Sequence, residues 1–239
     1  MKLISVVLLL LAPLLTSCQT ILFPLDCSDI YKNVNTRASG VYTIFPIKTT
    51  SEVQVYCEMN SEGGRWTVFQ RRLDGTVNFY RTWDQYRTGF GNPAGEYWLG
   101  LENIFQLVNR KKYELMVDME DFEGNKAFAR YTSFSIASEC DGYRLNVSGF
   151  IYGGAGDSLN YHNGQKFTTV DRDQDSSTGS CAKYYLGAFW YNNCQEANPN
   201  GVYRWGADNS IQGVGVEWKG FKGTNYSLKT ISMKIRPVV

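Results

Sequence analysis

The first eighteen residues indicate the compartment in which this chain folds. Lys2 gives a short basic start, and an almost continuous apolar run, interrupted by Pro13, covers residues 3–15 before small and polar residues follow. This layout is typical of a cleaved secretory signal peptide, and the run is shorter than the roughly 20 residues that a membrane-spanning helix needs. We therefore predict a signal peptide at residues 1–18, a mature chain at residues 19–239, secretion into the extracellular space or matrix, and no membrane span.

Cysteines exported to an oxidising compartment are expected to pair. Five follow the predicted leader, at Cys27, Cys57, Cys140, Cys181 and Cys194, and Cys18 lies at the predicted cleavage point. The spacing suggests two local disulfides, Cys27–Cys57 and Cys181–Cys194. This leaves Cys140 as a free thiol, as a link to a second chain, or as a partner of a retained Cys18.

The charge balance excludes two classes of partner. The chain has 24 basic and 23 acidic residues, and Lys2 is the one charged residue of the leader, so the mature chain carries no net charge. A nucleic-acid footprint or a general attraction to anionic membranes therefore does not follow. The 16 Tyr, 13 Phe and 6 Trp residues must largely fill a core, although Tyr and Trp also suit a ligand-binding surface.

Hydrophobic periodicity predicts a body made mainly of strands. Apolar and polar residues alternate, or β-branched and aromatic residues gather, over residues 40–45, 52–59, 65–73, 113–118, 126–136, 143–147 and 233–236. Met116 breaks the alternation of its strand. Helical spacing predicts one helix over residues 101–108, and a second is expected to start near Thr82 or Asp84, because both residue types cap helices.

Residues 151–226 differ from the rest, because they are rich in Gly, Asn, Asp, Ser, Tyr and Trp and show little periodicity. A loop-dominated stretch of this length inside a compact domain normally serves a function or holds a metal. Within it, Asp171, Asp173 and Asp175 place carboxylates at alternate positions. Such carboxylates can converge on a calcium ion, which takes six to eight oxygen ligands.

The 171–181 segment is not an EF-hand loop. Its sixth position is Ser176 where that loop needs glycine, and its twelfth is Ala182 where that loop needs glutamate. Two interpretations stay open at this point: a calcium loop of another kind, or a hydrated acidic turn in which three carboxylates repel one another.

Catalysis is the weakest interpretation of the sequence. His162 is the single histidine, it lies in a predicted turn, and no partner for it is evident. The cysteines include no Cys-x-x-Cys pair of the kind that binds zinc.

Two N-glycosylation acceptors, Asn146 and Asn225, are present. We therefore expect a secreted glycoprotein that is not an enzyme.

The chain resembles the fibrinogen C-terminal domain family over residues 25–237. The matching motifs lie in order along the chain, at residues 26–27, 40–42, 55–59, 63–72, 89–91, 95–100, 156–159, 171–181, 193–194, 200–203 and 233–237. The resemblance implies an α+β fold with a central antiparallel sheet, short helices and a loop-rich calcium-binding C-terminal subdomain. It implies an N-terminal subdomain at about residues 25–65, a sheet subdomain at 66–149, the loop-rich subdomain at 150–227, and a strand at 228–237 that returns to the sheet.

The resemblance also implies the disulfides Cys27–Cys57 and Cys181–Cys194 and a calcium site. The implied ligands are the side chains of Asp173 and Asp175 and the backbone carbonyls of Ser177 and Gly179. Asp171 would be peripheral to the ion.

Lectin-like members of the family bind acetyl groups beside the second disulfide. The resemblance implies a pocket lined by Tyr185, Cys194 and residues 208–214. The chain departs from the acetyl-binding pattern at Gln195, where such members often carry histidine, and near Ile211, where an aromatic residue is expected.

Two functions of different classes follow. The first is a calcium-dependent recognition glycoprotein that binds extracellular matrix components of microfibrils, elastic fibres or collagen and supports cell adhesion. The alternative is a soluble lectin-like pattern-recognition protein for acetylated or related glycans in innate immunity. A single weak site gains from clustering, so a homo-oligomer is expected.

Overall fold

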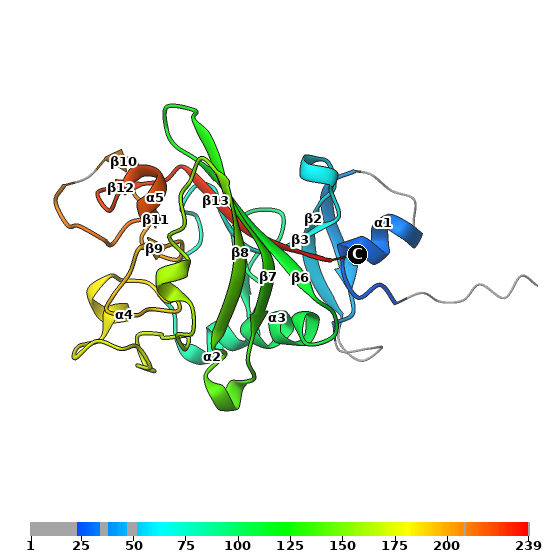
Figure 1. The fold of residues 1–239 in the computed structure, drawn as a ribbon, viewed down its shortest axis with the longest axis horizontal. Helices are drawn as coiled ribbons and strands as arrows, with labels where there is room; N and C mark the ends of the chain where they lie inside the picture. The colour runs from blue at the N-terminus through cyan, green and yellow to red at the C-terminus, as the bar shows by residue number, and fades with distance from the viewer. Residues whose placement is uncertain (1–22, 34–37, 47–51, 208, 239) are drawn as a thin grey trace, which may run out of the picture.

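The centre of the fold is an antiparallel sheet, seen in a computed structural model that describes residues 23–33, 38–46, 52–207 and 209–238. Its strands run in the order β1-β2-β3-β13-β6-β7-β8, and β5 pairs with β3 and β4 with β5. Figure 1 shows the central strands β3, β13, β6, β7 and β8. The bounds are β1 Gly40–Ile44, β2 Val53–Glu58, β3 Trp66–Arg72, β4 Phe90–Gly91, β5 Tyr97–Trp98, β6 Tyr113–Glu120, β7 Lys126–Ile136, β8 Leu145–Gly153 and β13 Thr230–Pro237. The C-terminal strand β13 thus lies between β3 and β6. This confirms the predicted fold class.

The helices are short. They are α1 Cys27–Asn33, α2 Trp83–Thr88, α3 Leu101–Val108, α4 Cys181–Tyr184 and α5 Lys219–Lys222, with 3-10 turns at η2 Ser61–Gly63, η3 Glu139–Asp141 and η4 Asn160–His162. Helix α3 has the predicted bounds, and it buries Leu101, Ile104, Leu107 and Val108. Helix α2 starts one residue after Thr82, whose backbone N–H donates to Gln85 Oε1 at 3.2 Å.

An aromatic core lies between the sheet and the loop-rich part of the chain. Trp98 contacts Phe167 and Trp190, with ring centroids 5.6 and 6.3 Å away, and Phe134 of β7 packs against Trp190 and Phe69. All five rings are buried. Burying large aromatic surfaces of this kind contributes much of the stability of a domain.

Charged side chains cover part of the other face of the sheet. Glu114 of β6 pairs with Arg236 and Arg130, and Lys234 of β13 pairs with Asp118. Lys234 and Arg130 lie opposite Met116 in the register. Their long aliphatic stems can cover apolar surface, which accounts for the burial of Met116 where the alternation predicts exposure.

The strand expected over residues 143–147 begins later than predicted. Tyr143 has a positive φ of 49° and follows η3 and Gly142, so it belongs to the turn between β7 and β8. Its side chain still points inward, because its hydroxyl donates to Glu102 Oε2 at 2.8 Å.

The rest of the chain forms an irregular part at the left of Figure 1. It contains α4, α5 and two small antiparallel pairs, β9 Ala197–Asn198 with β11 Glu217–Trp218 and β10 Gly206–Ala207 with β12 Tyr226–Ser227. Helix α1 and strands β1 and β2 lie at the opposite end. The predicted signal peptide and Cys18 fall outside the described residues. No described helix is long and apolar enough to cross a membrane.

Candidate functional site

The acidic segment predicted to bind a metal is a loop held at several points. Gln174 N–H donates to Thr168 Oγ1 at 3.0 Å, and Ser176 N–H donates to Asn192 O at 3.2 Å. Asp171 caps α2, since its Oδ1 accepts from Trp83 N–H at 2.8 Å and from the Thr169 hydroxyl. These two hydrogen bonds to Asp171 Oδ1 anchor the loop to α2.

Asp173 and Asp175 lie next to each other in this loop. Asp175 N–H donates to Asp173 Oδ1 at 3.4 Å, and Asp175 accepts from Ser177 N–H at 2.9 Å and from Cys181 N–H at 2.8 Å. Burial, with the nearby Asp173 carboxylate as a further cause, raises the pKa of Asp175. Two adjacent carboxylates of this kind are stabilised by a cation.

The backbone of the same loop leaves further oxygens available. No described residue donates a hydrogen bond to the carbonyl oxygens of Ser177 or Gly179. With Asp173 and Asp175 they make a donor set that is all oxygen, which suits a hard cation such as calcium once water completes the shell. No cluster of three or more His, Cys, Asp or Glu side chains poised for a metal occurs among the described residues, so the carbonyls are essential to this fit.

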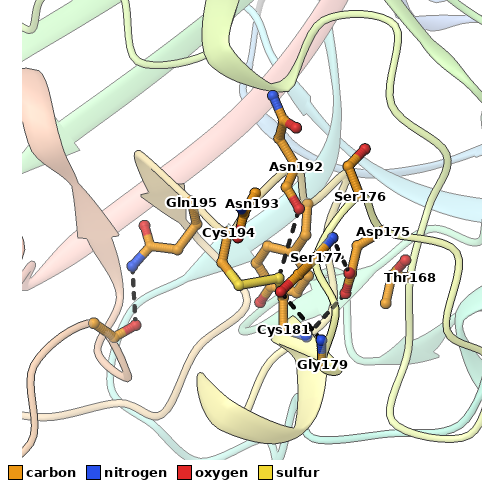
Figure 2. Close-up of a disulfide and its surroundings, with 12 residues drawn as sticks. Thr168, Asp175, Ser176, Ser177, Gly179, Cys181, Asn192, Asn193, Cys194 and Gln195 are labelled. Carbon is orange, nitrogen blue, oxygen red and sulfur yellow. Dashed lines mark hydrogen bonds between the residues drawn. A yellow bond between two sulfur atoms is a disulfide. The ribbon is translucent and has the colours of Figure 1, made fainter.

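The disulfide Cys181–Cys194 joins the acidic loop to the segment expected to bind a ligand (Figure 2). Cys181 opens α4 and donates its N–H to Asp175, while Cys194 follows a cis peptide bond with Asn193. The other disulfide, Cys27–Cys57, ties α1 to β2. Cys140 is exposed and pairs with no described cysteine.

Tyr185, Gln195 and Gly213, which were expected to line the ligand pocket, pack against one another. Tyr185 packs so closely on Gly213 that a Cβ added there would lie 2.4 Å from Tyr185 Cε1. Gln195, directly after Cys194, donates from Nε2 to Gly213 O at 3.2 Å. Ile211, two residues before Gly213, is 57 % exposed, so its side chain does not close this cluster. Asp208, at the start of the expected lining segment, is outside the described residues.

Sequence reasoning missed two polar residues at the base of this cluster. Asn198 is buried and donates from Nδ2 to Tyr185 O and Gly213 O at 3.0 and 3.1 Å. Glu217 is 2 % exposed and lies within 3.4 Å of Gln195 Nε2. The available signal was the charge of Glu217 inside the otherwise apolar run at residues 214–218.

His162 holds the backbone of the segment that follows Cys194 in place. Its Nε2 accepts from the backbone N–H groups of Glu196 and Ala197, both at 3.1 Å, so the ring proton resides on Nδ1, which donates to Trp190 O at 2.7 Å. Burial lowers the pKa of His162 to about 4. The single histidine is thus a neutral structural group with every ring nitrogen occupied.

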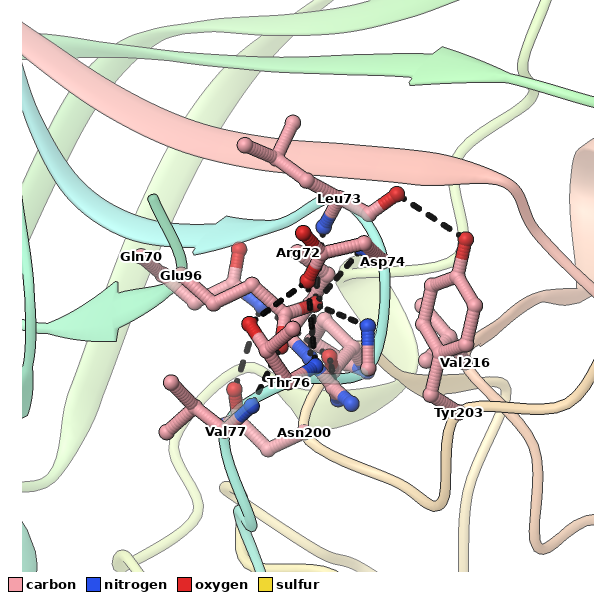
Figure 3. A network of polar contacts seen from close by, with 12 residues as sticks. Gln70, Arg72, Leu73, Asp74, Thr76, Val77, Glu96, Asn200, Tyr203 and Val216 are labelled. Carbon is pink, nitrogen blue, oxygen red and sulfur yellow. Dashed lines mark hydrogen bonds and ion pairs between the residues drawn. The ribbon is translucent and has the colours of Figure 1, made fainter. Parts of the chain in front are cut away.

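A second buried network joins the sheet to the loop-rich part (Figure 3). Arg72 of β3 donates to Gly201 O at 2.7 Å and lies 3.4 Å from Glu96. Glu96 accepts from the N–H groups of four residues, which are Leu73, Asp74, Gly75 and Val77. Burial alone would raise the pKa of Glu96, but hydrogen bonds from Val77 and Leu73 and the charge of Arg72 hold it below its ordinary value.

Both predicted glycosylation acceptors lie on the surface. Asn146 is exposed on β8, and Asn225 is exposed just before β12. A glycan at either position would therefore point into solvent.

The family described as fibrinogen beta and gamma chains, C-terminal globular domain, matches residues 23–238. This chain belongs to that family. Microfibril-associated glycoprotein 4 of Bos taurus is 53 % identical over 218 residues, which cover 89 % of this chain and 85 % of that protein. Fibrinogen C domain-containing protein 1 of Homo sapiens is 51 % identical over 217 residues, covering 89 % of this chain and 46 % of the longer protein.

Solved structures agree with this membership. The fibrinogen-like globe domain of human ANGPTL2 matches with a TM-score of 0.86 and 48 % identity, covering 90 % of this chain and 99 % of that one. Lamprey fibrin D-dimer, complexed with the peptide ligand Gly-His-Arg-Pro-amide, matches with a TM-score of 0.84 and 34 % identity, covering 91 % and 74 %. The expected family and its fold are therefore confirmed.

Proposed function

We propose that this chain is a secreted, calcium-dependent recognition glycoprotein that binds extracellular matrix components of microfibrils, elastic fibres or collagen and supports cell adhesion. The observation that carries the proposal is the identity of more than half of the aligned residues with microfibril-associated glycoprotein 4, along most of both chains. That protein's name associates it with microfibrils. A shared fold alone would be a weaker argument, because one fold serves many functions.

Calcium is part of the proposal. The side chains of Asp173 and Asp175 and the carbonyls of Ser177 and Gly179 would hold it. A bound ion would offset the repulsion between the two carboxylates and favour one loop conformation. Asp175 also accepts from Cys181 N–H. An ion that orders the loop would therefore also restrict the motion of the Cys181–Cys194 disulfide and of the segment that follows Cys194.

Binding, and not catalysis, fits the polar groups of this region. His162 uses both ring nitrogens in backbone hydrogen bonds, so neither nitrogen is available as a general base. The carboxylates of Asp171 and Glu96 are likewise engaged with backbone N–H groups. These residues therefore build the site without offering a reactive group.

A glycan-binding function is the second candidate, favoured by aromatic side chains on the surface of the loop-rich part. Tyr184 is 68 % and Trp205 is 74 % exposed, and Tyr184 lies against Gly179 of the acidic loop. Exposed aromatic rings present flat apolar faces with polar edges to a ligand. Against acetyl recognition, the Gln195 side chain crosses the expected pocket to Gly213.

We also propose that the chain acts as a homo-oligomer. The exposed thiol of Cys140 is available for a link between copies in an oxidising compartment. Several copies on one matrix fibre would bind far more tightly than a single weak site.

The test is binding of the secreted, glycosylated protein to immobilised purified microfibrils and fibrillar collagen, with calcium or with a chelator. We expect saturable binding that the chelator abolishes and that Asp175→Asn weakens at least tenfold. Asp84→Asn is the matched control, because Asp84 is exposed and, among the described residues, its carboxylate pairs only with Arg87 of the same helix turn. Calcium-dependent retention on N-acetylglucosamine resin without matrix binding would favour the glycan function instead.

A further inference from the structure

A groove of about 470 Å³ lies on the face of the sheet that points away from the loop-rich part. Arg72 of β3 reaches into the loop-rich part, and successive side chains of a strand point to opposite faces, so Arg71 points into the groove. Ser232 of β13 lies opposite both Arg71 and Asp118 of β6. Phe128 of β7 lies opposite Asp118. The four side chains therefore form one row across strands β3, β13, β6 and β7 (Figure 1).

The side chain of Ser232 leaves the middle of this row hollow, because its neighbours Arg71 and Asp118 are longer. Phe128 lies at the end of the row on β7, where its ring packs on Gly153 of β8. A Cβ added to Gly153 would lie 2.3 Å from that ring. Ligand pockets measure about 300–1,000 Å³, so the groove is large enough to receive part of a ligand.

The guanidinium of Arg71 is held in place but lacks an acceptor. It stacks on the ring of Tyr56 of β2, with Cζ 4.1 Å from the ring centroid. Its Nη1 is buried and donates to no described residue. A buried donor without an acceptor costs free energy, so an anion supplied by a ligand would stabilise this arrangement.

The carboxylates that line the groove are already paired. Asp118 pairs with Lys234, and Glu120 pairs with Lys126 at 3.6 Å. Among the described residues that line the groove, Arg71 is therefore the charge left unmatched. A polyanion such as a sulfated glycan would be repelled by Asp118 and Glu120, whereas a polypeptide that carries a single carboxylate would meet Arg71 without this repulsion along its length.

We propose that this groove binds an extended polypeptide segment through one acidic side chain, held by Arg71, and one apolar side chain, held by Phe128. Arginine and a carboxylate form strong, charge-assisted hydrogen bonds. Neighbouring strands lie about 4.8 Å apart, so the row from β3 to β7 is about 14 Å long. An extended chain advances about 3.4 Å per residue and points alternate side chains to one side. The acidic and apolar residues of the ligand therefore lie about four positions apart.

This groove is separate from the calcium-dependent site. The acidic loop with Asp173 and Asp175 belongs to the loop-rich part, on the other side of the sheet, and shares no lining residue with the groove. Peptide binding in the groove therefore does not rest on the proposed function, and a chelator leaves it unchanged.

The test is isothermal titration calorimetry of the secreted, glycosylated protein with the peptide acetyl-Glu-Thr-Ser-Thr-Phe-amide. We expect saturable binding that is equal in calcium and in chelator. A peptide with glutamine in place of glutamate should bind about tenfold more weakly or worse, because it loses the charged hydrogen bonds. A peptide with glutamate and phenylalanine three positions apart should also bind more weakly. Equal affinity for the glutamate and glutamine peptides, or absence of binding, overturns the proposal.

Two variants of the protein locate the site. Arg71→Gln removes the cation, and Ser232→Tyr fills the hollow while Arg71 stays in place. We expect each to weaken peptide binding about tenfold or more, with thermal unfolding showing which variants are folded. Arg110→Gln is the matched control, because Arg110 is exposed just before β6, at the far end of that strand from the groove.

Unchanged peptide binding in the folded variants would place the peptide elsewhere and overturn the proposal. Heparin is the competing probe: binding of heparin that Arg71→Gln abolishes, without binding of the glutamate peptide, would assign the groove to an anionic glycan instead. Peptide binding together with a failure to bind microfibrils or collagen would contradict the proposed function and leave the groove as assigned.

Discussion

Replacing His162 tests how the fold supports the segment after the second disulfide. The imidazole makes three hydrogen bonds to backbone groups at Glu196, Ala197 and Trp190, and it is fully buried. His162→Ala leaves two buried N–H donors and one carbonyl without a partner and opens a cavity. Each unsatisfied buried group costs about 1–3 kcal/mol, so three of them lower the free energy of unfolding by about 3–9 kcal/mol, a large share of ordinary domain stability.

His162→Gln is the matched variant. A glutamine amide oxygen can take the place of Nε2 and keep accepting from Glu196 and Ala197, while the bond to Trp190 is lost. We expect this variant to lose only about 1–2 kcal/mol. The comparison separates lost hydrogen bonds from lost titration, because glutamine does not change charge.

The stability of the unaltered protein should depend on pH in a way that the stability of His162→Gln does not, and the direction of the difference can be stated. The pKa of His162 is lowered in the folded state to about 4, whereas the unfolded chain titrates near 6.5. Between these values the unfolded state binds more protons, so the stability contributed by neutral His162 is complete above pH 6.5 and is lost as pH falls towards 4. The loss amounts to about 3 kcal/mol and should be absent from His162→Gln.

Urea unfolding monitored by tryptophan fluorescence, at pH 4.5 and pH 7 with disulfides intact, measures both effects. The quantity to compare is the difference between the unaltered protein and His162→Gln at each pH, since carboxylates also titrate in this range. A difference that does not change with pH would refute the buried, neutral state of His162. A loss below about 1 kcal/mol for His162→Ala would refute the three hydrogen bonds.

Three other changes probe separate parts of the structure. Glu96→Gln should lower the free energy of unfolding in urea by about 3 kcal/mol, because a neutral amide cannot accept from four backbone N–H groups and face a buried arginine. A change smaller than about 0.5 kcal/mol would contradict the network. Replacing Cys181 and Cys194 together by serine should lower stability by about 3 kcal/mol in the same assay. Asp173→Asn and Asp175→Asn should each abolish the rise in melting temperature that calcium produces in calorimetry. If the rise survives in both variants, calcium binds at another place.

The regular elements followed from periodicity because their burial is one-sided. Helix α3 and strand β7 have the predicted bounds, since each presents one apolar face to the same core. Tyr143 was misplaced because a buried aromatic side chain gives the same signal in a turn as in a strand. Met116 broke the pattern because charged partners on neighbouring strands cover it, and these partners are distant in sequence.

The candidate site was predictable only in part, for a related reason. The acidic loop is a local pattern, so the alternating carboxylates of Asp171, Asp173 and Asp175 were evident from their spacing, whereas the choice of Asp173 and Asp175 as ligands came from the family resemblance. The roles of Asn198 and Glu217 depend on backbone groups of Gly213 and Tyr185 and on Gln195, which loops bring together from separate segments. No short-range pattern encodes such contacts.

Hydrogen–deuterium exchange of the secreted protein, free and bound to purified microfibrils in calcium, tests the central claim most directly. The account predicts that binding protects residues 171–195 and 209–217, and that a chelator removes this protection together with binding. Protection confined to the sheet around β7 and β8, or protection that survives the chelator unchanged, would contradict calcium-dependent recognition by the loop-rich part.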